Sequence, residues 1–439
     1  MTSKTRLGLF DLSMIVIGLV IGMGIFRTAR EAGDAALTPS IYFMAWVAGG
    51  IIALCGALTY AEIGSRYPVT GGYYKVFAYA YHPSIAFALN CSILISNAAS
   101  ISGVALIGAG YINSVFFHDT TQVVPMIIAM VAIFLFYGVN LLGLRMSAKT
   151  QSFLMIIKIA MLLLLISAIF MPSTHHPNNV PLDTPVDGSW SQILGSFGLC
   201  LVAVSFAYGG YQQTINFGSE IKNPARNIPR GIFIGITVII SLYLLVNIVY
   251  YKVVGFNEIA DSREIASIVV GKMFGQGGAD IFSVLLFLSV LAYVNVSMMS
   301  NPRVIYAMSE DGSLPAIFQK KSEQKQVYVV ALTVFAAIAF VVVFFAETFD
   351  KILAFSIFLD SFGMATSAAT IFILRKRTKH LDGTGIYKMK LFPLMPVLFI
   401  LAYAFVCGSI IVTSPMIALT GTCVLIGFTL LYFVFKRKK

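Results

Sequence analysis

Long apolar stretches alternate with short polar segments along the whole chain. A helix that crosses a bilayer core of about 30 Å needs about 20 mostly apolar residues. Twelve stretches satisfy this requirement, at residues 9–28, 38–61, 84–112, 123–143, 149–171, 192–217, 229–251, 275–301, 326–346, 351–374, 391–412 and 415–435. The pattern predicts an all-α membrane protein with twelve transmembrane helices.

The composition supports the bilayer as the main solvent. Charged residues make up 11% of the chain and hydrophobic residues 58%, whereas a soluble domain carries about 25% charged residues. So few charges could not cover a surface that faces water. The first apolar stretch is too long for a signal peptide and lacks a small-residue cleavage site, so we expect it to stay as the first helix.

The basic residues gather in every second polar segment along the chain, counted from the N-terminal one, and this alternation predicts the topology. Those segments contain Lys4, Arg6, Arg66, Lys75, Arg145, Lys149, Lys222, Arg226, Arg230, Arg303, Lys320, Lys321, Lys325, the cluster 375–390 and the C-terminal 436–439. The positive-inside rule then places both termini in the cytoplasm. We expect a multi-pass protein of the cell (plasma) membrane, and the net charge of +11 is a topology signal that predicts no nucleic-acid partner.

Glycine-rich runs interrupt two of the predicted spans part-way across the membrane. The run 22–26 (GMGIF) lies in the first span, and the run 206–211 (FAYGGY) lies in the sixth. Unwound backbone at membrane depth is tolerated only where it lines a cavity or is buried in protein. Alternatively, each run could be a patch where helices pack closely.

The two interruptions occupy matching positions. They open two groups of five spans, residues 1–171 and 192–374, and two further spans follow at 391–435. An odd number of spans in each group inverts the second group relative to the first. Paired interruptions at corresponding positions are typical of transporter binding sites. We therefore predict a 5+5 inverted repeat with two extra helices.

Broken helices provide backbone groups for a ligand. The N-terminus of a half-helix presents free N–H groups and a positive dipole end, which suit a carboxylate. Carbonyls freed at the C-terminus of a half-helix suit an ammonium. A site with both groups would recognise the backbone of an α-amino acid without a charged side chain.

At these residues the chain resembles the amino acid–polyamine–organocation superfamily, and within it the L-type amino acid transporter branch. The resemblance covers the whole chain and rests on the motifs Gly22-x-Gly24-Ile25-Phe26, Phe206-Ala207-Tyr208-Gly209-Gly210, Glu220-x-Lys222-Asn223-Pro224-x-Arg226-x-Ile228-Pro229-Arg230 and Arg303-x-x-Tyr306-Ala307-Met308-Ser309-x-Asp311-Gly312. It implies a LeuT-type fold with spans 11 and 12 outside the repeat.

The resemblance also implies which residues bind the substrate. The carboxylate would bind the N–H groups of Met23 and Gly24, the ammonium would bind carbonyls near the two breaks, and the Phe206 ring would act as a gate. The family usually has Ser in place of Met23 and often Trp in place of Tyr211, which leaves the size of the side-chain pocket open. The implied substrate-binding residues are Val20, Gly22, Met23, Gly24, Ile25, Phe206, Ala207, Gly209, Gly210 and Tyr211.

Two ionisable residues fall deep inside predicted spans. Lys158 lies near the middle of the fifth span, where a cation is costly and suggests a function. In related transporters that lack sodium coupling, a lysine at this position is similar to the occupant of a sodium site, bonded to a carbonyl that matches Gly18. Alternatively, Lys158 is a structural cation that never titrates.

Asp360 is the carboxylate that we place deepest in the bilayer, in the tenth span. It could form an outer-gate ion pair with Arg27, or accept hydrogen bonds from Ser356, Ser361 or Thr366, or bind a cationic substrate side chain. Nearer the cytoplasm, Glu62 and Glu220 end the second and sixth spans beside Arg66 and Lys222. There they are expected to lock loops or to form inner-gate pairs.

These features predict a sodium-independent secondary transporter of neutral L-amino acids that works by exchange or by proton coupling. A cationic amino acid or polyamine permease of the same superfamily is the alternative. A channel, a receptor or a membrane-embedded enzyme fits less well, because the spans are interrupted, no signalling domain is present and all five histidines fall in loops. No cofactor is expected.

The predicted partners are an amino acid and the lipid bilayer. Animal relatives of the branch attach to an accessory glycoprotein through a Cys after the third span. The corresponding loop, residues 113–122, contains no Cys, so we expect the single chain to function without a disulfide-linked subunit.

Overall fold

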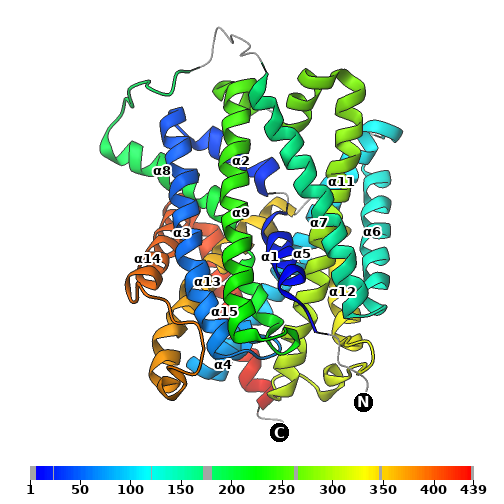
Figure 1. Cartoon of the computed structure of the whole chain (residues 1–439), viewed down its shortest axis with the longest axis vertical. Coiled ribbons are helices and arrows are strands. Elements are labelled where there is room, and N and C mark those ends of the chain that lie inside the picture. Colours follow the sequence, from blue (N-terminus) through cyan, green and yellow to red (C-terminus); the bar gives the residue numbers. More distant parts are fainter. Residues whose placement is uncertain are drawn as a thin grey trace.

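The computed structural model describes residues 6–22, 24–119, 121–171, 180–261, 265–345 and 349–436. In these ranges every regular element is a helix (Figure 1). The chain is therefore an all-helical membrane protein, as the apolar pattern predicts.

Ten helices in the described ranges are long and apolar enough to cross a membrane. They are α3 (Pro39–Arg66), α5 (Pro83–Ile112), α6 (Val123–Leu141), α7 (Leu144–Ser167), α8 (Trp190–Tyr208), α9 (Pro224–Val253), α11 (Ile265–Glu310), α13 (Phe349–Arg377), α14 (Leu394–Thr413) and α15 (Pro415–Lys436). Two apolar helices are shorter, α1 (Leu9–Val20) and α12 (Val329–Val343). The helix α12 is shorter than the predicted span 326–346, whereas α11 consists of two helices joined at a kink at Gly275.

Both predicted interruptions are present in the structure. The first span stops where α1 ends at Val20 and resumes as α2 (Gly24–Ala35). In the sixth span, α8 ends at Tyr208, and beyond Gly209-Gly210 the chain continues as the 3-10 turn η3 (Tyr211–Asn216). The unwound backbone is thus where the glycines predict it.

The two breaks pack directly against each other. Gly210 has a φ of +113°, and a Cβ atom at this residue would lie 2.2 Å from the carbonyl oxygen of Leu19. A Cβ on Gly24 would lie 2.9 Å from the Cα of Ala207. Glycine is therefore required at both positions, at Gly210 for its backbone conformation as well as for space.

Short helices and turns connect the long helices at both ends of the molecule. They are α4 (Gly72–Ala80), α10 (Phe256–Asp261), the π turn η1 (Asn113–Phe117) and the 3-10 turns η2 (Ala168–Phe170), η4 (Gly218–Glu220), η5 (Ala316–Gln319) and η7 (Lys379–Leu381). The described part of the chain begins and ends at the same end of the molecule, together with α4 (Figure 1). We call this end the terminal end.

Helices from the two halves of the chain pack in pairs. Helix α3 packs along α9, α5 along α11, and α1 against α9. The contact between α1 and α9 is close because Gly235 faces Val16, where a Cβ atom would come within 2.4 Å of a Val16 methyl carbon. Small residues allow such close approach of membrane helices. The packing holds α1 and η3 side by side in the middle of the bundle.

Candidate functional site

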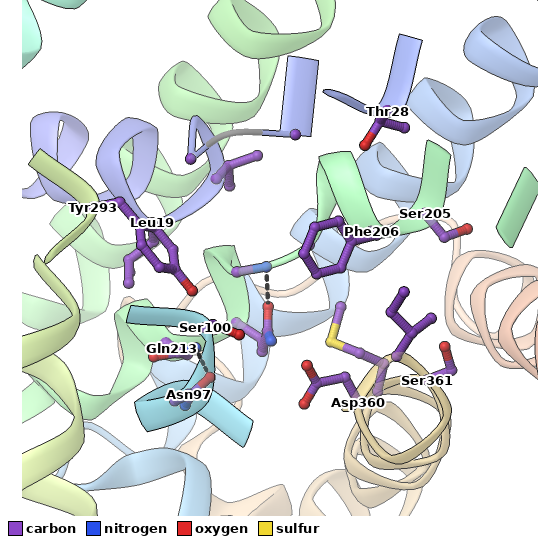
Figure 2. A pocket seen from close by; sticks show the side chains of 18 of the residues that line it. Leu19, Thr28, Asn97, Ser100, Ser205, Phe206, Gln213, Tyr293, Asp360 and Ser361 are labelled. Carbon is purple, nitrogen blue, oxygen red and sulfur yellow. Dashed lines mark hydrogen bonds between the residues drawn. The ribbon is translucent and has the colours of Figure 1, made fainter. Parts of the chain in front are cut away.

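A cavity of about 110 Å³ lies where the two broken helices meet. Figure 2 shows Leu19, Tyr293, Asn97 and Ser100 on one side of this cavity, and Phe206, Asp360 and Ser361 on the other. The complete lining consists of Leu19, Val20, Gly22, Gly24, Thr28, Glu31, Asn97, Ser100, Val104, Ile107, Ser205, Phe206, Gly209, Gly210, Gln212, Gln213, Tyr293, Ile357, Asp360, Ser361, Met364 and Tyr403.

The first break presents backbone N–H groups to the cavity. Helix α2 begins at Gly24, and the first N–H groups of a helix have no partner inside that helix. Before the break, the N–H of Ile21 donates to the carbonyl of Ile17 at 2.7 Å, and the N–H of Gly22 donates to the carbonyl of Val20 at 2.8 Å. The N-terminus of α2 therefore provides the uncommitted donors at this break, which suit an anion.

The second break is partly capped by its own chain. The N–H of Gly209 donates to the carbonyl of Phe206 at 3.3 Å. The side chain of Gln212 turns back, and its Oε1 accepts from the N–H of Gly210 at 2.9 Å. This cap removes an anion-binding donor at η3, so a carboxylate is directed to α2. Sequence reasoning did not assign this role to Gln212.

Six of the predicted substrate-binding residues line the cavity, namely Val20, Gly22, Gly24, Phe206, Gly209 and Gly210. Met23 lies outside the described residues. Ile25 and Ala207 are buried but do not line the cavity.

Tyr211 also does not line the cavity, so its role in substrate binding stays a prediction. Its ring packs edge-on against Tyr60 of α3, with ring centroids 5.9 Å apart. Tyr211 opens the 3-10 turn η3, so its side chain follows the geometry of that turn and not that of an α-helix.

A chain of amide groups forms a polar wall that the glycine motifs did not predict. Asn97 Nδ2 donates to Asn301 Oδ1 at 2.6 Å, and Asn301 Nδ2 donates to the carbonyl of Ser297 at 2.9 Å. Gln213 Nε2 reaches Asn97 Oδ1 at 3.5 Å. The signal in the sequence is the spacing of Asn97, Ser100, Val104 and Ile107, which places all four on one face of α5.

Lys158 connects the fifth span to the first break, but not at the predicted residue. Its side chain is fully buried, and Nζ donates a hydrogen bond to the carbonyl oxygen of Ile21 instead of that of Gly18. Gly18 faces Gln151, two turns before Lys158 on α7, and a Cβ at Gly18 would lie 1.9 Å from Gln151 Nε2. The unwinding of the chain after Val20 makes the Ile21 carbonyl available, which explains the difference.

Asp360 is half-buried and lines the cavity. Among the side chains that the structure describes, none donates a hydrogen bond to it. Thr366 donates to the carbonyls of Phe362 and Gly363 instead. The side chains of Arg27 and Ser356 lie outside the described part of the structure, so the Arg27–Asp360 pair stays a prediction.

Buried ion pairs join helices at the terminal end. Glu62 at the end of α3 accepts from Arg66 Nε at 2.7 Å, from Arg375 Nη2 at 2.7 Å and from the N–H of Met389 at 2.8 Å. These contacts hold the segment 378–393, which we call the strap, against α3. The expected pair between Glu62 and Arg66 is confirmed.

The second terminal-end cluster differs from the expected one. Glu220 pairs with Arg303 of α11 at 2.5 Å, not with Lys222, and accepts from the Tyr328 hydroxyl at 3.2 Å. The N–H of Leu7 donates to the carbonyl of Glu220 at 2.8 Å, which joins the segment before α1 to η4. The cluster thus connects both broken spans to α11.

Comparison with known proteins identifies the family. The profile of the amino acid permease family matches residues 7–435, so the chain belongs to this family of membrane transporters. The prediction of a permease of the amino acid–polyamine–organocation superfamily, and not of an enzyme, is therefore confirmed.

Full-length relatives carry names of the same kind. The chain is 29% identical to the serine/threonine exchanger SteT of Bacillus subtilis, over 99% of the chain and 98% of that protein. It is 25% identical to the mouse b(0,+)-type amino acid transporter 1, over 94% of the chain and 84% of that protein. It is 23% identical to the mouse Asc-type amino acid transporter 1, over 99% of the chain and 82% of that protein.

Proposed function

We propose that this permease carries neutral L-amino acids across the plasma membrane by alternating access, without sodium, and by exchange or proton coupling. The observation that supports this function most directly is the pair of adjacent helix breaks that line one cavity. The substrate carboxylate binds at the N-terminus of α2, near Met23 and Gly24. The ammonium binds carbonyls near Val20, Phe206 and Gly209, and the Phe206 ring gates the site.

We also propose twelve spans with both termini in the cytoplasm. The helices α1 and α2 together form the first span, and α12 forms the ninth, which raises the ten long helices to twelve. The repeat units are residues 1–171 and 192–374, followed by 391–435.

The packing supports an inverted 5+5 repeat. If the first five spans correspond to the next five, then the contact of α1 with α9 corresponds to that of α8 with α3, and both contacts are present. In the same way, the contact of α7 with α11 corresponds to that of α13 with α5, and both are present. The contact of α6 with α11 corresponds to that of α12 with α5, and both are present as well. The short connecting helices also correspond, since the contact of α10 with α2 matches that of α4 with η3.

The names of the relatives agree with an amino acid substrate. The Bacillus subtilis relative is named as a serine/threonine exchanger, and the mouse relatives are named as amino acid transporters. A single chain is proposed to suffice, because residues 113–122 offer no Cys for a disulfide to a second subunit.

A cationic substrate is the second candidate. The cavity lining contains the carboxylates of Glu31 and Asp360, and no Lys, Arg or His is among the described lining residues. A negative wall attracts a cation. Transport of lysine or putrescine at the rate of alanine would favour this candidate over the first.

Reconstitution of the purified chain tests the proposed function. Liposomes that are empty or preloaded with amino acid are exposed to a radiolabelled panel, with sodium replaced by choline and with or without a pH gradient. We expect uptake of free neutral amino acids, no competition by their methyl esters, amides or decarboxylated amines, and no sodium dependence. Strict dependence on sodium or on a second subunit would contradict the proposal.

Two glycine variants provide a matched pair for this assay. Gly24→Ala places a methyl group within 2.9 Å of the Ala207 Cα and should abolish uptake. Gly427→Ala adds the same methyl group in open space on α15 and should leave uptake unchanged. Equal activity in both variants would mean that the break at α2 is not the binding site.

A further inference from the structure

Asp360 and Ser100 face each other across the cavity. Asp360 extends from α13, and Ser100 extends from α5 on the opposite side of the cavity (Figure 2). Because a substrate whose carboxylate and ammonium are held by the two breaks must direct its side chain elsewhere, the wall between α5 and α13 is available for that side chain.

The Asp360 carboxylate needs a hydrogen-bond donor from the cavity. An ionised carboxylate only accepts hydrogen bonds, and removing it from water without a donor is costly. In the described part of the chain no side chain donates to Asp360, although the residue is half-buried. A substrate side chain with a donor would fill this deficit, whereas an aliphatic side chain would not.

Two amides of the opposite wall, those of Asn97 and Asn301, are committed to one another. Asn301 Nδ2 donates to the Ser297 carbonyl, so its Oδ1 must accept, and it does so from Asn97 Nδ2. Asn97 Oδ1 then faces Gln213 Nε2. The hydroxyl of Ser100 lies on the same face of α5 and can adapt to a ligand, since a hydroxyl both donates and accepts.

We propose that Asp360 and Ser100 form the subsite for the substrate side chain and select α-amino acids with a short hydroxylated side chain. The substrate hydroxyl donates to Asp360 and accepts from Ser100. The apolar residues Val104, Ile357 and Met364 line the same cavity, each about one helical turn from Ser100 or Asp360, and suit a methyl group beside the hydroxyl. This assignment rests on the proposed function and specifies its substrate class.

The subsite is compatible with a second partner for Asp360. A carboxylate has two oxygens and accepts about four hydrogen bonds. One oxygen can therefore pair with Arg27 of α2 while the other accepts a hydrogen bond from the substrate hydroxyl. The subsite concerns substrate affinity, and an ion pair with α2 concerns the rate of closure, so separate measurements distinguish the two roles.

Competition binding to the purified full-length chain tests the subsite. The inhibition constants of serine, threonine, alanine, leucine and lysine are measured for the wild type, Asp360→Asn and Ser100→Ala. In Asp360→Asn we expect about a tenfold weaker affinity for serine and threonine and no change for alanine, because a charge-assisted hydrogen bond is replaced by a weaker one. Ser100→Ala should weaken the same two ligands to a smaller extent.

The control is Asp280→Asn, which makes the same change at a half-buried carboxylate of α11 that lies outside the cavity lining and accepts from Gln276 at 2.9 Å. It should leave every constant unchanged. Equal losses for all five ligands in both cavity variants, or a loss confined to lysine, would overturn the hydroxyl subsite and leave amino acid transport intact. A wild type that binds none of the five would overturn the proposed function itself.

Discussion

The buried cation Lys158 connects two helices through one carbonyl. A charged side chain at the centre of a membrane helix costs about 2.5–3.5 kcal/mol on insertion scales. In this protein the charge is matched by the carbonyl oxygen of Ile21, which belongs to the unwound part of the first span. We infer that Lys158 stabilises the break and therefore the shape of the binding site.

Lys158→Ala should reduce amino acid exchange by about tenfold or more, because it leaves a buried carbonyl without its donor, at a cost of about 1–3 kcal/mol. The measurement is exchange in liposomes, with gel filtration to show that the variant is folded. The matched control is Lys149→Ala, which removes an exposed lysine from the same helix α7 and should have no effect. Wild-type kinetics in Lys158→Ala would remove this role.

Single residues show where prediction from the sequence ended. The glycine breaks and the buried lysine were predicted, because glycine pairs and a mid-span charge are visible in the sequence itself. The Ile21 carbonyl and the orientation of Tyr211 were not, since both depend on how far the backbone leaves α-helical geometry. The Asn97 wall was missed because its partners Asn301 and Gln213 are distant in sequence.

At the terminal end, the strap joins the end of α3 to the end of α13. Glu62 is fully buried, and it accepts hydrogen bonds from two arginines and from the backbone of the strap. Arg375 also lies over the Phe392 ring, with the guanidinium carbon 3.7 Å from the ring centroid. The sequence predicted a role for Glu62 in loop locking, but the docking of residues 378–393 is a long-range contact without a local pattern.

Removal of the Glu62 charge should therefore destabilise the protein. Breaking a buried ion pair by changing one partner costs about 3–5 kcal/mol, whereas an exposed pair contributes about 0–1 kcal/mol. Glu62→Gln should lower the melting temperature of the detergent-solubilised protein. The control Glu310→Gln changes an exposed carboxylate that pairs with Lys75 at 2.8 Å and should leave the melting temperature unchanged. Equal melting temperatures for the two variants would mean that the Glu62 pairs contribute nothing net.

The ion pair between Asp382 of the strap and Arg66 of α3 does not respond to pH in the neutral range. Hydrogen bonds from Lys388 and Arg66 hold the pKa of Asp382 below its usual range. A carboxyl with a lowered pKa contributes its stabilisation fully above its unfolded pKa of about 3.9, and loses it as the pH falls through the lower folded value. Between about pH 5 and 8, this contact is therefore constant.

The whole molecule combines ion-pair clusters at the terminal end with a cavity that extends along α2. The Glu62 and Glu220 clusters join helices at the terminal end, whereas the cavity lining continues past the first break to Thr28 and Glu31. Under the alternating access that we propose, the α2 side must close around the substrate before the terminal end opens. Arg27 follows Gly24 by less than one turn of α2, and we propose that it closes this side.

An ion pair between Arg27 and Asp360 is the closing contact that we predict. Because the pair would form only in the closed state, its loss would raise the cost of closure and not the cost of folding. Arg27→Ala and Asp360→Asn should each slow the turnover of alanine exchange more than they weaken alanine binding.

The double variant is the decisive measurement. If the two side chains meet, either single change already leaves the other charge without its partner, so the second change adds little. We therefore expect the combined loss of turnover to be smaller than the sum of the two separate losses in free energy. Alanine is the substrate of choice, because it makes no demand on the side-chain subsite of Asp360. Additive losses would show that the two residues never pair, and closure would then depend on Phe206 and the packing of α2 alone.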